Sequence, residues 1–503
     1  MHPYALCALL ALSGPALATQ SADRPQPATT ATTATDPRAE AADNAAAFLL
    51  SKQDPATGGW GVAPGRPVFP AITGLALQGL LTRPGASMED PAISRAVNFL
   101  LSHQQENGGI YDRILPTYNT AISLTALAQV PRPDAKVTAA IARAQAYLKT
   151  LQFGEGAVAY ESGESARVVT KDDPFYGAWG YGNHGRPDLS NSSFAIEALH
   201  ASGLPENDAA YQRALVFLRR CQMLDLPAGD ANDLPYARGS NQGGFIYATS
   251  ENKDSLGSGQ SFAGEVAESL SGPPGVSVTF TLSPGADGQP RTLTRAECAQ
   301  LLDKQKQALI SGGSKADFIV LHGPGMSGGK SSAFEVRTAA PDPIAASEFV
   351  LAAFGDALDP DSLIAKPVTH WQGESRLRAY GSMSYSGFKS YLYAGLTPTD
   401  PRVQAAQRWI SQNYTLEENP GVGTDGLYYY FLVFSRALRA SGLDAVPSPV
   451  GGPPRDWRAD LVTRLRGLQQ PDGSFKPVDD RWMENDPVLI TAYALIALQE
   501  ARR

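Results

Sequence analysis

The sequence predicts an all-α fold, an (α/α)6 toroid in which six pairs of outer and inner helices close into a ring, with a small α+β insertion in the fourth pair. Three observations predict it. A short motif recurs along the chain, the stretches around each copy alternate in their apolar pattern, and one pair is split by a long segment of different character. Such recurrence is typical of repeat architectures, in which each unit buries its apolar face against its neighbours.

The recurring motif is a Leu, a Gln four residues later, and then a Gly-rich turn that ends in an aromatic or aliphatic residue. Glycine lets the chain leave a helix through positive φ, and the apolar residue then packs beneath the turn. The Gln side chain can bond helix-terminal backbone groups. Clear copies are Leu49/Gln53 with Gly58-Gly59-Trp60, Leu100/Gln104 with Gly108-Gly109-Ile110, Leu218/Gln222 with Gly243-Gly244-Phe245 and Leu465/Gln469 with Gly473-Ser474-Phe475; weaker ones are Leu148/Gln152 and the region of Trp409 to Tyr414.

The stretches before and after each copy differ in their apolar pattern. An amphipathic stretch such as 91–104 or 457–469 comes before the turn, and an almost wholly apolar stretch follows it. A helix that is apolar on one face lies at the surface, whereas one that is apolar all round is buried. The predicted inner helices are therefore 71–81, 118–130, 189–202, 383–396, 427–443 and 487–501.

The fourth pair is interrupted between residues 250 and 374. Residues 276–282 and 333–338 alternate as strands do, and helices are expected at 294–310 and near 344–354. Within this segment, Gly325 to Gly329 match the G-x-S-x-G pattern around Ser327. A nucleophile elbow requires a strand before it, a helix after it and a parallel sheet beneath it. Because residues 330–336 have a strand pattern, a hairpin loop is the favoured interpretation and a hydrolase the alternative.

The N-terminus has the pattern of an export signal. A short apolar run precedes Ala16-Leu17-Ala18, and an Ala, Thr and Pro-rich tether follows. We therefore expect a periplasmic or secreted protein cleaved near Thr19, with no transmembrane segment in the mature chain. The net charge of −8 and the lack of a basic stripe argue against a nucleic-acid partner. The predicted organisation is a signal peptide (1–18), a linker (19–37), the first part of the toroid (38–250), the α+β insertion (251–375) and the second part of the toroid (376–503).

The repeats resemble the QW repeat of the squalene–hopene cyclase and prenyltransferase superfamily. The chain is also similar to bacterial exported prenyltransferase or squalene-oxidase repeat proteins of undefined activity, through residues 380–389, 413–421, 480–482 and 486–487. The resemblance implies a toroid with a central cavity for an isoprenoid or other apolar ligand. It carries over no reaction, because the D-x-D-D acid motif, the D-D-x-x-D magnesium motif and the Asp, Cys and His zinc ligands are all missing. The nearest approach to the acid motif has Pro477 in place of its first aspartate. No metal or cofactor is therefore predicted.

Candidate site residues come from the starts of the inner helices, which in the resembling family surround the cavity mouth. The catalytic candidates are Asp188, Asp425 and Asp486; the ligand-cavity candidates are Tyr118, Asn119, Asn191, Tyr385, Lys389, Tyr428 and Trp482. The alternative for the three aspartates is a structural role as helix N-caps. Of the consecutive rings from Tyr428 to Phe431, at least one must pack between helices, because neighbouring helical positions point in different directions.

The leading functional hypothesis is an exported toroid protein that binds, and as an enzyme would transform, an isoprenoid or other apolar ligand. One alternative is a carbohydrate-active enzyme, a polysaccharide lyase or hydrolase, with a glycan as its ligand. The other is a non-catalytic scaffold that binds a protein partner through residues 251–375. The sequence leaves open whether the protein is an enzyme, and the lining of the central cavity would distinguish the three.

Overall fold

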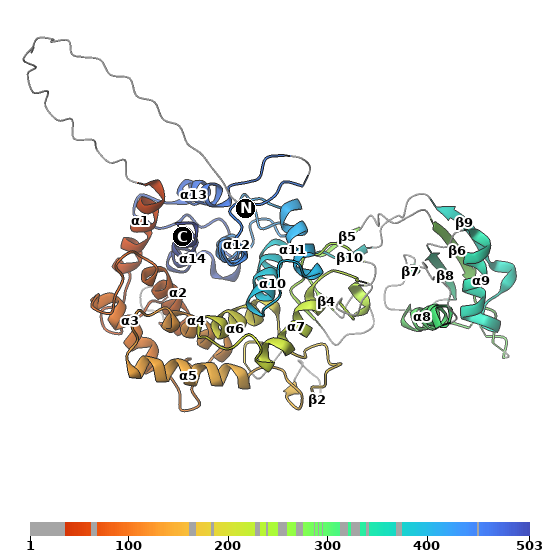
Figure 1. Ribbon diagram of the computed structural model, residues 1–503, viewed down its shortest axis with the longest axis horizontal. Coiled ribbons are helices and arrows are strands. Elements are labelled where there is room, and N and C mark those ends of the chain that lie inside the picture. Colours follow the sequence, from red (N-terminus) through yellow and green to blue (C-terminus); the bar gives the residue numbers. More distant parts are fainter. Residues whose placement is uncertain are drawn as a thin grey trace, which may run out of the picture. The chain divides into compact units, whose positions relative to one another are not determined.

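The described part of the chain is mostly helical, and its sheets are small. The computed structural model describes residues 36–61, 68–159, 167–182, 186–226, 232–237, 240–249, 259–267, 275–285, 287–289, 291–293, 295–311, 320–322, 332–338, 342–368, 375–449 and 452–502 (Figure 1). The predicted export signal and nearly all of the predicted linker lie outside the described residues, as does Ser327. In the residues described, no helix is both long and apolar enough to cross a bilayer.

Twelve helices occur where the sequence predicts the helix pairs. Six that we call the outer helices are α1 (Pro37–Ser51), α3 (Pro91–Ser102), α5 (Ala135–Thr150), α7 (Ala209–Cys221), α11 (Pro401–Gln412) and α13 (Trp457–Leu468). Six that we call the inner helices are α2 (Pro70–Leu81), α4 (Pro116–Ala128), α6 (Leu189–Ala201), α10 (Gly381–Tyr393), α12 (Leu427–Ser441) and α14 (Pro487–Arg502). Each inner helix contacts the next one in this order, and α14 contacts α2, so the contacts form a closed cycle (Figure 1).

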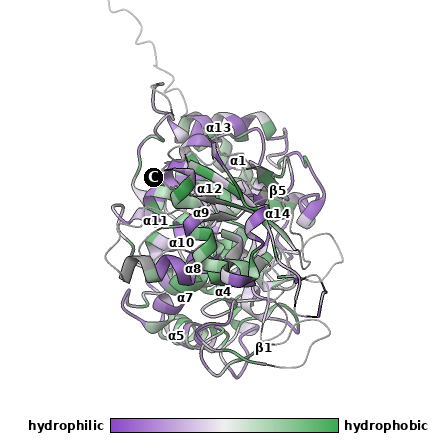
Figure 2. Cartoon of the chain, turned by 90° about the vertical axis from the view of Figure 1, so that its right-hand side faces the viewer, coloured by the Kyte–Doolittle hydropathy of each residue, from purple (hydrophilic) through white to green (hydrophobic). Residues whose placement is uncertain are grey.

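Burial follows the predicted division between the two sets. Every residue of α2 is buried, whereas α3 buries one face. Figure 2 shows hydrophobic residues concentrated along inner helices such as α12 and α4. A helix surrounded by protein on all sides is apolar on all its faces unless its buried polar groups find partners, which explains the largely apolar sequence of α2.

The repeated Gln residues join neighbouring repeats. Each Gln side-chain amide donates to the carbonyl of its own Gly turn and to a carbonyl in the first turns of another outer helix. The prediction that the Gln side chains bond backbone groups is therefore confirmed. The carbonyl pairs are Gly58 and Ala92 for Gln53, Gly108 and Ala140 for Gln104, Gly177 and Ala210 for Gln152, Gly243 and Arg402 for Gln222, and Gly473 and Ala41 for Gln469. The last of these joins the final outer helix to the first. Those outer-helix carbonyls lie inside helices and also accept the ordinary bond from the N–H four residues later. They therefore accept the Gln amide with a second lone pair.

The turn glycines are required by close packing as well as by backbone conformation. Gly177 has φ +90° and Gly473 has φ +86°. A Cβ at these positions would lie 1.8 Å from the Arg213 carbonyl oxygen and 2.2 Å from the Asn44 carbonyl oxygen. Only glycine avoids both penalties.

A further repeated contact could not be read from the motif. The backbone N–H after each Gly-Gly or Gly-Ala pair donates to a Thr or Ser hydroxyl in the first turns of an inner helix. The donor and acceptor pairs are Trp60 to Thr73, Ile110 to Thr120, Trp179 to Ser192 and Phe245 to Ser384, at 2.9–3.0 Å. These bonds anchor each turn to the inner helix that follows.

Residues 275–368 form a separate small α+β unit with its own hydrophobic cluster. Its four-stranded sheet has the order β7 (Val320–His322), β8 (Ala333–Thr338), β6 (Gly275–Thr281), β9 (Ile364–Val368), and all neighbours are antiparallel. Helices α8 (Arg295–Ser311) and α9 (Pro343–Phe354) accompany it, and Val278 pairs with Val336 within its core. The strands that flank Ser327 in sequence, β7 and β8, are antiparallel neighbours, whereas a nucleophile elbow requires a parallel sheet.

Three two-stranded sheets complete the described secondary structure. They are β1 (Val158–Ala159) with β2 (Arg167–Val168), β3 (Ala248–Thr249) with β4 (Gly259–Gln260), and β5 (Glu265–Ala267) with β10 (Ser375–Leu377). Short 3-10 turns lie at η1 (Pro235–Ala237), η3 (Gly355–Ala357), η4 (Pro360–Ser362) and η5 (Arg481–Met483). Cys221 and Cys298 are both buried, and they belong to different hydrophobic clusters.

Candidate functional site

Four aromatic rings meet at the N-terminal ends of the inner helices. We call them the aromatic quartet: Tyr118 of α4, Phe194 of α6, Tyr429 of α12 and Tyr493 of α14. Successive ring centroids in this order lie 5.4, 5.9 and 6.2 Å apart, and the Tyr118 and Tyr493 hydroxyls, 3.3 Å apart, close the cycle. Each ring belongs to the first two turns of its helix.

The quartet is uncharged at physiological pH. Burial raises the pKa of Tyr118 to about 12, and burial also raises the pKa of Tyr429 and Tyr493. The Tyr429 hydroxyl bonds to the Ser190 and Ser386 hydroxyls, at 3.1 and 3.4 Å. Neutral aromatic faces carry negative partial charge and suit apolar or cationic groups.

Asp188 directly precedes α6, the helix that carries Phe194 of the quartet. As the N-cap of α6 it accepts from the Asn191 backbone N–H and side-chain amide, both at 2.8 Å. Burial raises the pKa of Asp188 to about 6, although the bonds from Asn191 and Tyr247 oppose the shift. Its carboxyl group therefore exchanges its proton closer to neutral pH than an ordinary aspartate.

Large apolar side chains are exposed around the same helix ends. We call Ile114, Leu115, Tyr181, Trp482 and Met483 the apolar rim; they expose 52, 38, 45, 43 and 48% of their surfaces. Leu115 (φ +52°), Trp482 (φ +54°) and Met483 (φ +68°) have left-handed backbones. The Thr117 N–H donates to the Tyr181 carbonyl at 3.2 Å, which ties two parts of the rim together. Strain of this kind persists only where the surrounding structure holds it, and it clusters at functional sites.

Glu484 follows Trp482 in the same turn, and its side chain links this turn to α12. The carboxylate of this buried residue accepts from the Tyr428 and Tyr429 N–H groups, at 2.9 and 2.7 Å, and so caps α12, whose own N-cap residue is Gly426. Burial raises the pKa of Glu484 to about 7. The Trp482 ring also packs against Phe262, at 5.5 Å between centroids.

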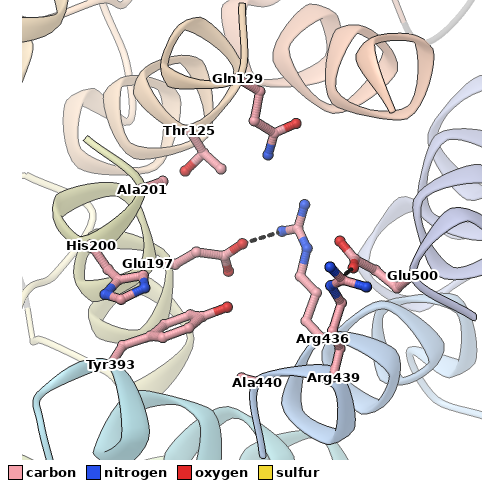
Figure 3. A pocket seen from close by; sticks show the side chains of 10 residues that line it. All are labelled: Thr125, Gln129, Glu197, His200, Ala201, Tyr393, Arg436, Arg439, Ala440 and Glu500. Atoms are coloured by element: carbon pink, nitrogen blue, oxygen red, sulfur yellow. Dashed lines mark ion pairs between the residues drawn. The ribbon is translucent and has the colours of Figure 1, made fainter. Parts of the chain in front are cut away.

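A polar cavity occupies the opposite, C-terminal ends of five inner helices. Its volume is about 240 Å³. Its lining residues are Thr125 and Gln129 near the end of α4, Glu197, His200 and Ala201 of α6, Tyr393 of α10, Arg436, Arg439 and Ala440 of α12, and Glu500 of α14 (Figure 3).

The charged groups at this cavity form ion pairs. Glu197 bonds to Arg436 at 2.6 Å and to Lys389, while Arg439 bonds to Glu500 at 3.0 Å. Burial alone would raise the pKa of Glu197, but the charges of Arg436 and Lys389 outweigh it and hold the pKa below its ordinary value. Burial lowers the pKa of His200, whose ring stacks on Tyr393 at 4.3 Å.

The predicted site residues therefore fall into several groups. Tyr118 belongs to the quartet, Asp188 and Asn191 lie at the start of α6, the helix that carries Phe194, and Trp482 belongs to the apolar rim. Asn119 accepts from the Ala71 N–H at 2.9 Å and so caps α2, a neighbouring inner helix, while Asp486 caps its own helix through the Leu489 N–H at 2.8 Å. Asp425 is not an N-cap, because Gly426 holds that position in α12; it pairs with Arg481 instead. Tyr385 and Tyr428 are fully buried among neighbouring side chains, and Lys389 lies at the polar cavity end.

Sequence reasoning missed the residues that complete both features. Phe194 and Tyr493 lie inside apolar stretches and carried no separate signal, and Tyr429 was noted only as one of the consecutive rings from Tyr428 to Phe431. Glu197 and Arg436 are charges within predicted inner helices, a pattern that should have indicated buried ion pairs. In the described residues, no group of three or more His, Cys, Asp and Glu side chains could hold a metal ion.

Comparison with known proteins adds little at this level of similarity. No family model matches the chain, and no curated protein matches it. The solved structures include the type II terpene cyclase MstE from Scytonema in complex with geranylgeranyl dihydroxybenzoate, its substrate, at 14% identity and a TM-score of 0.35, covering 92% of this chain and 97% of the other. They also include a protein from Actinoplanes at 12% identity and a TM-score of 0.29, covering 93% and 100%. TM-scores this low decide neither fold nor function.

Proposed function

We propose that the protein is an α/α toroid that binds an isoprenoid or similarly apolar ligand at the N-terminal ends of its inner helices. The observation that carries the proposal is the combination of the aromatic quartet with the apolar rim at one end of the same helices. The closed cycle of inner-helix contacts and the bond from Gln469 to Ala41 support the toroid.

The rim supplies the driving force for binding. Trp482 exposes 43% of its surface, which is roughly 100 Å² for a side chain that can bury about 250 Å². Covering half of that area contributes about 1.3 kcal/mol at ~25 cal/mol per Å², close to a tenfold change in Kd. Single exposed apolar side chains are ordinary, and it is the gathering of five of them around the same helix ends that favours a binding site for an apolar partner.

The acid strength of the site favours binding over protonation of the ligand. Asp188 is a predicted catalytic aspartate whose charge acts on Tyr429 of the quartet, and its pKa is about 6. An acid of that strength is far too weak to protonate an isolated alkene. We therefore propose Asp188 as a group that contacts a polar end of the ligand, while Asp425 and Asp486 keep their structural partners.

The proposal includes export and a role for the inserted segment. Residues 1–18 would direct the chain out of the cytoplasm, and residues 251–375 would form an inserted domain able to bind a protein. Mass spectrometry of the protein from its host should find a chain that begins near Thr19. An intact N-terminus recovered from the cytosol would contradict export.

Titration calorimetry with geranylgeraniol in detergent tests the binding proposal. Trp482→Ala and Tyr181→Ala should each weaken binding about five- to tenfold, in line with the apolar area that each removes. The matched control is Ile344→Ala, because Ile344 exposes 71% of its surface in α9, outside the inner helices. Equal affinity in all three variants and the parent protein, or no binding at all, would refute the proposal.

A further inference from the structure

We propose that the polar cavity at the C-terminal ends of the inner helices is a second binding site, for a small carboxylic acid that also carries hydroxyl groups. The site is independent of the apolar ligand proposed above. Thr125 of the cavity lies seven residues after Tyr118 of the quartet on α4, which is about 10 Å along the helix axis.

The volume sets the size of the ligand. The cavity measures about 240 Å³, equal to roughly eight water molecules at ~30 Å³ each. It is smaller than the pockets of about 300–1,000 Å³ that hold drug-sized ligands. A compound the size of a hydroxy acid or a monosaccharide acid fits this range, whereas a long isoprenoid does not.

Arg439 supplies the group that would recognise a carboxylate. Its Nε forms an ion pair with Glu500, but among the described residues neither of its Nη groups has a hydrogen-bond partner, and 38% of its side chain is exposed. The two Nη groups of a guanidinium form a planar fork that matches the two oxygens of a carboxylate. Among the lining residues, Arg436 and Arg439 face Glu197 and Glu500, and Lys389 adds a third cation behind Glu197.

Gln129 explains why the ligand needs hydroxyl groups. Its side-chain Oε1 is buried and has no hydrogen-bond partner, which is rare for a buried acceptor. A carboxylate offers no donor to this oxygen, but a ligand hydroxyl does. Figure 3 shows the Gln129 amide and the Tyr393 hydroxyl on different sides of the space around Arg436.

A purely structural role accounts for only part of the cluster. Glu197, Lys389 and Arg436 are buried and pair with one another. Arg436 also donates to the Gln78 side chain, and cations near helix C-termini interact favourably with the helix dipoles. That role does not explain the open fork of Arg439 or the unpaired oxygen of Gln129. These two groups distinguish a binding site from an internal ion-pair network.

Calorimetric titration of the full-length protein with three hydroxy acids tests this inference: D-galacturonate, D-gluconate and L-lactate. At least one acid should bind, and D-galactose and propionate, which lack the carboxylate and the hydroxyls respectively, should bind at least tenfold more weakly. Arg439→Gln and Gln129→Leu should each weaken acid binding at least tenfold. Arg408→Gln, at an exposed position of outer helix α11, is the control and should leave it unchanged.

Circular dichroism spectra establish that each variant is folded, and geranylgeraniol titration of Arg439→Gln should match that of the parent protein. Three results would each overturn the inference. The first is that none of the acids binds at tens of millimolar, and the second is that D-galactose binds as tightly as the acids. The third is that Arg439→Gln binds the acids as tightly as the parent protein does.

Discussion

Replacing Glu197 by glutamine should strongly destabilise the protein. The substitution keeps the shape of the side chain but removes the negative charge that pairs with Lys389 and Arg436. The three side chains expose only 1–7% of their surfaces, so the two cations would be left without a counter-charge in a medium of low polarity. Removing one partner from a buried ion pair costs about 3–5 kcal/mol.

A matched substitution separates this effect from the loss of any carboxylate. Glu500→Gln removes the partner of Arg439, whose side chain is 38% exposed and remains hydrated. Glu500 itself exposes only 11% of its side chain, but the cation left behind stays hydrated, so the cost should be about 0–1 kcal/mol, close to that of an exposed pair. A third protein, with Glu197→Leu, Lys389→Met and Arg436→Met together, should recover most of the stability lost in Glu197→Gln, because no buried charge is left unpaired.

Urea denaturation followed by circular dichroism gives the free energy of unfolding for each protein. The expected order of stability is parent, Glu500→Gln, and then Glu197→Gln by a clear margin, with the triple variant above Glu197→Gln. Equal stability of Glu197→Gln and Glu500→Gln would refute the reasoning that the buried charge decides the effect. The slope of the free energy of unfolding against urea concentration should be the same for all four proteins, because each should unfold over the same buried surface.

Three further outcomes are expected. Burial raises the pKa of Glu484 from 4.5 to about 7, so the folded chain binds this proton more tightly than the unfolded chain. The free energy of unfolding should therefore fall by up to about 3 kcal/mol as the pH rises from 4.5 to about 7. Glu484→Gln, which resembles the protonated form, should reduce this dependence of stability on pH. Gln469→Ala removes two hydrogen bonds, to Ala41 and to the Gly473 turn, and should cost about 1–3 kcal/mol in urea denaturation, against no measurable change for the exposed control Gln404→Ala. Incubation with squalene should give no cyclic triterpene by gas chromatography–mass spectrometry, and a cyclic product above a heat-killed control would contradict the absence of a strong acid.

The helix pairs could be predicted because each repeat carries its own local signal. The Gln, the turn glycine and the change from amphipathic to wholly apolar sequence all lie within a few residues of one another. The predicted range 71–81 differs from α2 by one residue at its start. The predicted range 383–396 lies two to three residues later than α10 at both ends, so local sequence locates each inner helix but not its exact ends.

The candidate site depended on helix rotation, which the sequence does not determine. Tyr118 and Tyr429 are each the third residue of an inner helix, and both rings join the quartet. Asn119 is one position further along and therefore points about 100° away, where it reaches α2 instead. Lys389 follows Tyr385 by one turn and pairs with Glu197, 192 residues away in sequence. Pairing over that distance comes from tertiary packing alone.

Photoaffinity labelling tests the central claim most directly. The purified protein would be irradiated with a geranylgeraniol analogue that carries a diazirine at its tail, and labelled peptides would be identified by mass spectrometry. The account predicts that labelling concentrates on the apolar rim, at Ile114, Leu115, Tyr181, Trp482 and Met483, and that unlabelled geranylgeraniol competes for it. Labelling spread over the surface, or concentrated in residues 275–368 or at the polar cavity, would contradict the claim that an apolar ligand binds at the N-terminal ends of the inner helices.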